Sequence, residues 1–147
     1  MYIREATATD LDTLMEMGLL LWPDESEGEL QQSFSDTFIR DTEITYLAET
    51  AEQEPIGFCI CSLRNDWVEG STGSPTGYLE AVFVHEAFRK TGMARELVQK
   101  GELWCRYNNC YQIDSDVELD NVASQAFHQA TGFRETNRLV TYIKELN

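Results

Sequence analysis

The sequence is short of basic residues. Its 147 residues include 11 Lys and Arg against 26 Asp and Glu, and the formal net charge is −15. This balance argues against nucleic acid or an anionic membrane surface as a partner, because both need a basic footprint. It favours a cationic substrate, whose local concentration the negative field raises; acidity that serves only solubility is the alternative interpretation.

Long apolar runs and zinc-finger spacings are also missing. No run approaches the roughly 18 apolar residues of a membrane span, and the N-terminus lacks the apolar core of a secretory signal, so we expect a cytoplasmic protein. Cys59 and Cys61 are one residue apart, which places both thiols on one face of a strand and is not a metal-finger spacing. Together with Cys105 and Cys110 they are expected to be mostly buried free thiols, and no metal is expected.

The apolar content is that of an ordinary folded domain. With a hydrophobic fraction of 42 % and no repeat, low-complexity segment or linker, we expect one domain over residues 1–147. Strands and helices alternate in the pattern, which predicts an α/β protein whose mixed sheet carries helices on both faces. The predicted strands are 2–5, 44–50, 56–63, 78–84, 111–115 and 135–144. The predicted helices run from a cap at Thr9–Asp12 to Leu21, from a capping box at Ser26 through Phe38, from Met93 through Trp104, and over 121–131 with Asp120 as cap.

The most informative segment is a strand, a loop and a helix start. The apolar run Tyr78–Val84 leads into Arg89-x-x-Gly92-x-Ala94, and an apolar helical face follows. Backbone N–H groups converge at such a helix N-terminus, and the helix dipole adds positive potential, which suits a pyrophosphate. Gly92 allows the backbone to approach a ligand closely. The hexapeptide alone is also typical of an ordinary turn before a helix.

A second segment, Asn121-x-x-Ser124-x-x-Phe127-His128-x-x-x-Gly132-Phe133, follows further along the chain. In this order and at this distance, the two segments resemble the acetyl-CoA signature of the GNAT superfamily of N-acetyltransferases. The resemblance covers the whole chain. It implies a central, mostly antiparallel twisted sheet flanked by helices, acetyl-CoA as co-substrate, and a loop that wraps the CoA pyrophosphate. The cofactor-binding residues that it implies are Val82, Phe83, Val84, Arg89, Lys90, Thr91, Gly92, Met93, Ala94, Asn121 and His128.

Scattered segments narrow this resemblance to one branch. Together they are similar to the small, dimeric aminoglycoside 6′-N-acetyltransferases, which implies the 6′-amino group as acceptor, antibiotic resistance and a homodimer. The last predicted strand, 135–144, is a candidate pairing element. The segments are Leu21-Trp22-Pro23, Asn65–Gly70 with Ser74-Pro75, Leu79-Glu80, Asp114-Ser115-Asp116 and Asp120-Asn121.

An aminoglycoside is a polyhydroxylated polycation, so its site needs carboxylates for ammonium groups and aromatic faces for rings. Glu80 stands in an apolar strand, where a carboxylate is costly unless it is paired or lines a cleft. Asp116 follows a strand end, where open sheets bind ligands. Trp67 lies in a polar loop, which favours a role in ligand binding. Trp22 could equally well cap the core at a helix end or form a wall of the site. The predicted substrate-binding residues are Trp22, Trp67, Glu80, Asp116, Glu135 and Asn137.

The resemblance implies direct attack of the amine on the thioester in a ternary complex, with no acyl-enzyme. Glu80 or Asp116 is the candidate base, and a backbone N–H near Phe83 or Val84 is the candidate donor to the thioester carbonyl. The chain departs from the family at His128, where many members have Tyr, and near Asn137, where the branch has a second carboxylate. Alternative functions are acetylation of a polyamine or a peptide N-terminus, and a non-catalytic acyl-CoA sensor.

Overall fold

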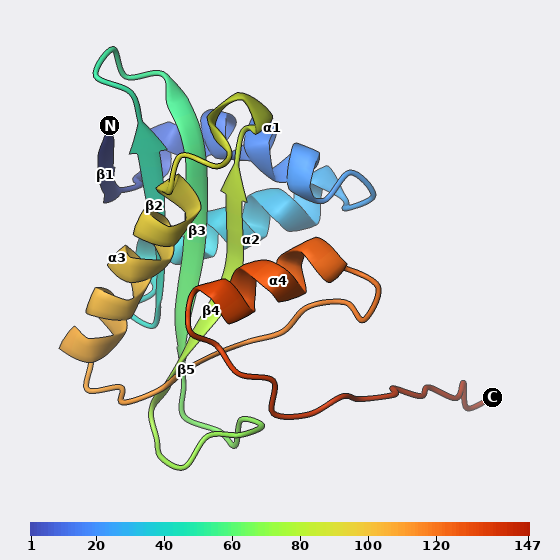
Figure 1. The fold of residues 1–147 in the computed structure, drawn as a ribbon. Helices are drawn as coiled ribbons and strands as arrows, with labels where there is room; N and C mark the ends of the chain where they lie inside the picture. The colour runs from blue at the N-terminus through green and yellow to red at the C-terminus, as the bar shows by residue number, and fades with distance from the viewer. The chain divides into compact units, whose positions relative to one another are not determined.

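The computed structural model describes residues 1–147 as two compact units, residues 1–116 and residues 117–147 (Figure 1). The first unit is built on a five-stranded sheet with the order β1-β2-β3-β4-β5. All neighbouring strands are antiparallel except β4 and β5, which are parallel. The strands are β1 (Tyr2–Glu5), β2 (Glu43–Glu49), β3 (Pro55–Arg64), β4 (Thr76–Val84) and β5 (Ile113–Ser115).

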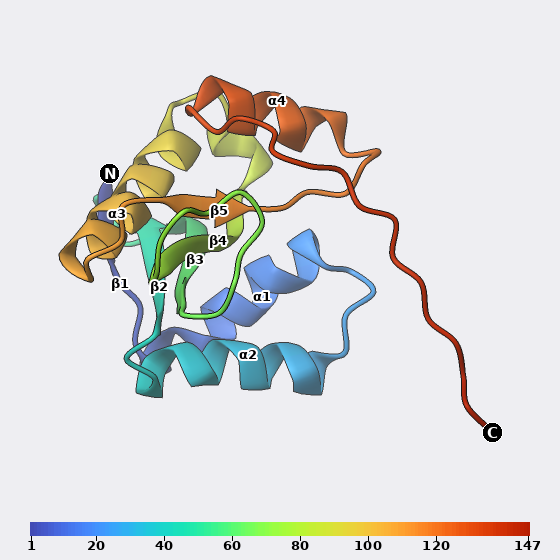
Figure 2. The same cartoon turned by 90° about the horizontal axis from the view of Figure 1, so that it is seen from below.

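Helices cover both faces of this sheet, as the alternating pattern predicts. Helices α1 (Leu11–Leu21) and α2 (Glu27–Ile39) lie on one side of the strands and α3 (Met93–Tyr107) lies on the other (Figure 2). Two short 3-10 helices, η1 (Ala8–Asp10) and η2 (Glu86–Phe88), precede α1 and α3. The predicted class, a mixed and mostly antiparallel sheet between helices, is therefore confirmed.

A hydrophobic core fills the space between the sheet and the pair α1 and α2. Leu14 and Phe34 from the helices are fully buried against Phe58 of β3. The Phe34 and Phe58 rings meet edge to face, with centroids 5.4 Å apart. Burial of one aromatic or aliphatic side chain of this size stabilises the folded state by roughly 1.5–3 kcal/mol. This packing holds β3 and β4 in place beneath the residues predicted to act on substrate.

Local capping chemistry starts the two helices of this face. Ser26 accepts a hydrogen bond from the Glu29 backbone N–H at 3.4 Å, as the capping box predicts. Helix α1 has Asp10 as its N-cap, within the predicted cap segment Thr9–Asp12. A turn of 3-10 helix precedes α1, and Thr7 and Asp10 form the capping box of that turn.

The second unit contains one helix, α4 (Val122–Ala130). Its cap is Asn121, whose side chain accepts from the Ser124 N–H at 3.1 Å, so the prediction of Asp120 as cap is wrong. The predicted strand over 135–144 is also wrong, because residues 133–147 form neither helix nor strand. Apolar alternation there predicts only which side chains share a face, whereas a strand also requires hydrogen bonds to a neighbouring strand. Its large apolar side chains, Leu139, Val140, Tyr142 and Ile143, are at least 73 % exposed.

Candidate active site

Glu80 occupies a β-bulge in β4. Ile60 of β3 pairs with Ala81 and Cys61 pairs with Leu79, so Glu80 is the extra residue between them. Such a bulge leaves one residue out of the regular ladder and turns its side chain to a new direction, which is common beside active sites. The Glu80 side chain is one-third exposed. The cost of a carboxylate in an apolar strand is thus avoided by exposure and by hydrogen bonds.

Two donors from β3 meet the Glu80 carboxylate. Ser62 Oγ donates to Oε1 at 2.6 Å, and an Arg64 Nη donates to the same oxygen at 2.9 Å. The Arg64 guanidinium carbon also lies 3.5 Å from the centroid of the Tyr78 ring, which is a cation–π contact. Ser62, Arg64 and Tyr78 were not predicted from the sequence. The period of two puts Ser62 and Arg64 on one face of β3, but only the register, with Ser62 opposite Tyr78, brings that face to Glu80.

The second predicted carboxylate belongs to the same group. Asp116 directly follows β5, which ends at Ser115, as the sequence predicts. Burial raises the pKa of Tyr78 to about 12, and the charge of Asp116 and a hydrogen bond to it contribute. Tyr78 therefore stays protonated at neutral pH. The ladder pairs Tyr78 with Asp114 and Leu79 with Ser115, so Asp116 follows β5 on the side of the sheet where Glu80 follows Leu79.

The two predicted tryptophans have different surroundings. Trp22 ends α1 and is partly buried, with its ring centroid 6.3 Å from that of Phe58. It therefore packs on the core between α1 and the sheet, which is one of the two roles that the sequence left open. Trp67 lies in the loop between β3 and β4 and is 79 % exposed. An exposed indole of this size is available to stack on a ligand.

The predicted anion loop has the backbone of an anion site. Lys90 and Gly92 have φ angles of 62° and 88°, and α3 starts after Gly92 without a side-chain cap. The N–H groups of the first turn of α3 therefore face outward with the positive end of the helix dipole. Arg89 Nε donates to the Val84 carbonyl at 2.9 Å, which ties the loop to the end of β4. A Cβ placed on Gly92 would have no atom within 4 Å, so the loop is open to a ligand.

The edge of β4 next to this loop is free of β5. The parallel ladder covers Gly77 to Leu79 against Ile113 to Ser115 and goes no further. Val82, Phe83 and Val84 therefore lie beyond the part of β4 that pairs with β5, while their other edge pairs with β3. Backbone groups on the edge away from β3 are available to a ligand that enters beside the strand. The loop and this edge fit an extended diphosphate thioester such as acetyl-CoA, with Arg89, Lys90, Thr91, Gly92, Met93 and Ala94 around the diphosphate.

The remaining predicted residues lie in the second unit. His128 Nδ1 is 2.8 Å from the Ser124 carbonyl oxygen, which only accepts, so Nδ1 carries the proton. The His128 ring packs on Phe133 with centroids 5.0 Å apart. Glu135 is ion-paired with Arg138 through its Oε1, and the Arg138 guanidinium lowers the pKa of that exposed carboxyl. Asn137 Oδ1 accepts from the Arg138 backbone N–H at 2.9 Å.

The four cysteines are buried and free, as predicted. Burial raises the pKa of Cys105 to about 12 and also raises the pKa of Cys110. A hydrogen bond with Cys59, followed by burial, raises the pKa of Cys61 still further. The thiols of Cys61, Cys105 and Cys110 therefore stay protonated at neutral pH and make poor nucleophiles. This agrees with an expected mechanism that has no acyl-enzyme.

No group of three or more His, Cys, Asp or Glu side chains is arranged to hold a metal ion. No helix has the length and apolar character needed to cross a membrane.

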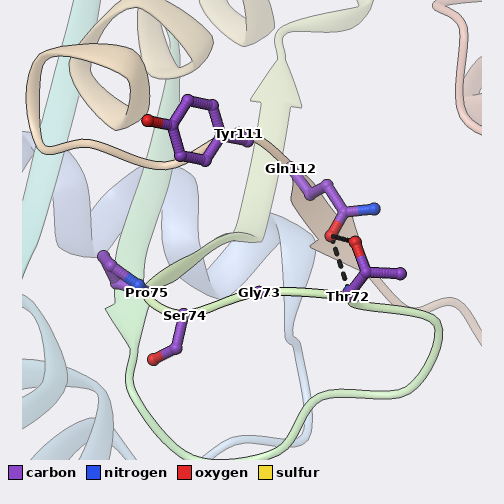
Figure 3. Close-up of a pocket in the computed structure, with 6 residues that line it drawn as sticks. All are labelled: Thr72, Gly73, Ser74, Pro75, Tyr111 and Gln112. Carbon is purple, nitrogen blue, oxygen red and sulfur yellow. Dashed lines mark hydrogen bonds between the residues drawn. The ribbon is translucent and has the colours of Figure 1, made fainter.

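A hollow of about 340 Å³ lies between the β3–β4 loop and the Tyr111–Gln112 segment (Figure 3). Gln112 Oε1 accepts from the Thr72 backbone N–H at 2.8 Å and from Thr72 Oγ1 at 3.2 Å, which fixes this part of the loop. None of the predicted site residues lines the hollow. Its lining is Thr72, Gly73, Ser74, Pro75, Tyr111 and Gln112.

The fold and the sequence of this chain are similar to those of known proteins. Residues 11–133 match the acetyltransferase (GNAT) family, and the chain belongs to this family. Aminoglycoside N(6′)-acetyltransferase type 1 of Acinetobacter baumannii is 35 % identical over 146 residues, 99 % of each chain. The protein of the same name from Salmonella typhimurium is 33 % identical over 144 residues, 98 % of this chain and 99 % of the relative.

Solved structures give the same result. AAC(6′)-Iy in complex with a bisubstrate analogue, CoA-S-monomethyl-acetylneamine, has a TM-score of 0.92 and 32 % identity, covering 99 % of this chain and 98 % of that one. The aminoglycoside 6′-N-acetyltransferase AAC(6′)-IG of Acinetobacter haemolyticus has a TM-score of 0.93 and 31 % identity over the full length of both chains. These relatives agree with this chain in fold and in length.

Proposed function

We propose that this protein transfers the acetyl group of acetyl-CoA to the 6′-amino group of aminoglycoside antibiotics and so confers resistance to them. The observation that carries the proposal is the full-length similarity to enzymes with this activity, one of them bound to a CoA–aminoglycoside analogue. The acidic group formed by Glu80 and Asp116 and the net charge of −15 support this proposal, because the substrate is a polycation.

The chain's own residues have three tasks in this reaction. Glu80 or Asp116 takes a proton from the substrate ammonium, directly or through water, because both carboxylates lie on the same side of the sheet. A backbone N–H near Phe83 or Val84 donates to the thioester carbonyl at the open edge of β4. Acetyl-CoA supplies the acetyl group already activated as a thioester, so the amine attacks it directly in the ternary complex.

Aromatic and polar side chains contact the two substrates in this proposal. Trp67 and the outer side of Trp22 form walls for the sugar rings. Glu135 and Asn137 add contacts to the aminoglycoside, and Asn121 and His128 to the CoA arm. With Nδ1 protonated, the other ring nitrogen of neutral His128 is an acceptor, so His128 protonates the leaving thiolate only as imidazolium. Departure of the thiolate without a protein acid is the alternative.

We also propose that the two units form a single acetyltransferase domain that acts as a cytoplasmic homodimer. The matched family segment, residues 11–133, spans both units, which supports one domain. Four reduced, buried thiols suit a reducing compartment. The exposed apolar side chains in the 139–143 segment favour pairing with a second copy. Analytical ultracentrifugation tests the dimer, and sedimentation at the mass of one chain would overturn it.

The activity is tested by release of free CoA thiol from acetyl-CoA in the presence of different amines. The panel contains kanamycin, an aminoglycoside with a hydroxyl in place of the 6′-amine, spermidine and a peptide with a free N-terminus. We expect turnover with kanamycin and none with the 6′-hydroxyl compound. Turnover only with spermidine or the peptide would replace the substrate assignment, and tight acetyl-CoA binding without any turnover would indicate a sensor.

A further inference from the structure

Arg64 has no part in the function proposed above, yet it contacts Glu80, one of the two candidate bases. It is the last residue of β3, and its guanidinium lies over the Tyr78 ring with one Nη at 2.9 Å from Glu80 Oε1. Its side chain is 43 % exposed, so it reaches the site from the rim. An arginine held by a carboxylate and an aromatic face at once has much less rotational freedom than a surface arginine.

The two hydrogen bonds to Glu80 are asymmetric. Ser62 Oγ and Arg64 Nη both donate to Oε1, while Oε2 has no protein donor. A carboxylate held through one oxygen presents the other in a fixed direction. The free oxygen is then oriented to accept a proton from an incoming ammonium or from a water that it binds.

The surroundings of Arg64 keep it charged and in place. Burial lowers its pKa, but the hydrogen bond to Glu80 and the charges of Glu80 and Asp116 together raise it above the ordinary value. The guanidinium is hydrogen-bonded to Glu80 and is also attracted by the charge of Asp116. It balances part of their charge and keeps the two carboxylates from repelling each other when both are ionised.

We propose that Arg64 is a positioning residue for catalysis, which acts by fixing the Glu80 carboxylate so that Oε2 faces the substrate amine. This inference rests on the proposed function, because it assigns the proton transfer to Glu80. Arg64 itself does not touch the reacting atoms. Its removal should therefore lower kcat by about tenfold, the loss expected for one charge-assisted hydrogen bond, and leave the KM for acetyl-CoA unchanged.

A double-mutant cycle tests this role. Arg64→Gln is made in the natural chain and in a Glu80→Gln background, and kcat with kanamycin is measured in all four proteins. If Arg64 acts through Glu80, the tenfold loss appears only where Glu80 is present, because coupled residues are not additive. Arg64→Lys keeps the charge and one donor and should recover part of the activity. Arg40→Gln, which removes another ion-paired arginine, at the end of α2, is the control.

Each other result has a separate meaning. An equal loss from Arg64→Gln in both backgrounds, or a loss explained by a lower unfolding temperature, would overturn the positioning role. A lower KM for kanamycin with unchanged kcat would also overturn it, because Arg64 would then be a cation that competes with the substrate. Absence of turnover in the natural protein with every amine tested would overturn the proposed function and this inference together.

Discussion

Gly101 of α3 lies directly against Cys61 of β3. A Cβ on Gly101 would come under 3.0 Å from the Cys61 Sγ, a distance that real Cβ atoms do not adopt. The missing side chain thus lets α3 approach the sheet closely, and α3 carries the anion loop at its N-terminus. The contact links core packing to the position of the proposed CoA site.

Replacement of Gly101 by alanine should therefore destabilise the protein. We expect a loss of about 1–3 kcal/mol from overpacking, larger than the helix-propensity gain of about 1 kcal/mol. Gly28, also in a helix, is the matched control, since its only neighbour within 4 Å is Ser26 Oγ at 3.8 Å. Gly28→Ala should be neutral or stabilising. Urea unfolding of both variants measures this, and equal stabilities would show that α3 shifts freely to accept a methyl group.

Gly92→Ala should weaken acetyl-CoA binding. Gly92 has a φ of 88°, a conformation that costs other residues roughly 1–2 kcal/mol, so alanine should change the shape of the loop. Gly70 in the β3–β4 loop has a φ of 82° and lies outside both acetyl-CoA segments, so Gly70→Ala is the matched control for strain alone. We expect similar losses of stability in both variants, but a loss of acetyl-CoA affinity of tenfold or more only in Gly92→Ala. Titration calorimetry that finds equal affinities would refute the pyrophosphate loop.

Glu80→Gln and Asp116→Asn should separate catalysis from cofactor binding. Loss of a general base lowers turnover by about 10²–10⁴-fold, so the variant with the larger fall identifies the proton acceptor. Acetyl-CoA affinity should stay unchanged in both, because neither residue is near the diphosphate in our proposal. Glu52→Gln, in the exposed turn between β2 and β3, is the control for charge. Normal kinetics in both site variants would remove these carboxylates from the mechanism.

Asp10 should make stability depend on pH at the acidic end. Its carboxylate accepts hydrogen bonds from Arg4 at 2.8 and 2.9 Å and from the Thr7 N–H at 2.8 Å. The Arg4 hydrogen bond, opposed by burial and helped by Thr7, lowers the Asp10 pKa below its ordinary value of 3.8. Because the folded pKa is the lower one, the stabilisation is complete above the unfolded pKa and is lost as the pH falls through the folded pKa.

The measurement compares urea unfolding of the natural protein with that of Asp10→Asn. We expect a difference of about 1–2 kcal/mol at pH 7, from the lost cap and charged hydrogen bonds. This difference should shrink as the pH falls below about 4, where the unfolded carboxyl is protonated. Asp24→Asn, at an exposed position, should show no such change. A difference that stays constant down to the acid transition would contradict the role of Asp10.

Local sequence patterns predicted most of the fold. β1 begins and ends at the predicted residues, and Ser26 caps α2, because alternation and capping depend on near neighbours in the chain. The predicted strand over 135–144 failed because alternation carries no information about a partner strand. The error at the cap of α4 arose because Asp120 and Asn121 are chemically equivalent candidates for an N-cap.

The sequence by itself determined the family. It also predicts the anion loop around Gly92 and the two candidate bases, Glu80 and Asp116, because each prediction depends on residue types at short spacing. The tertiary structure alone decided how Glu80 is held. The bulge shifts the register between β3 and β4 by one residue. Only this register brings Ser62 and Arg64 to the same oxygen of the Glu80 carboxylate. Register depends on pairing between segments far apart in the chain, so a linear pattern cannot specify it.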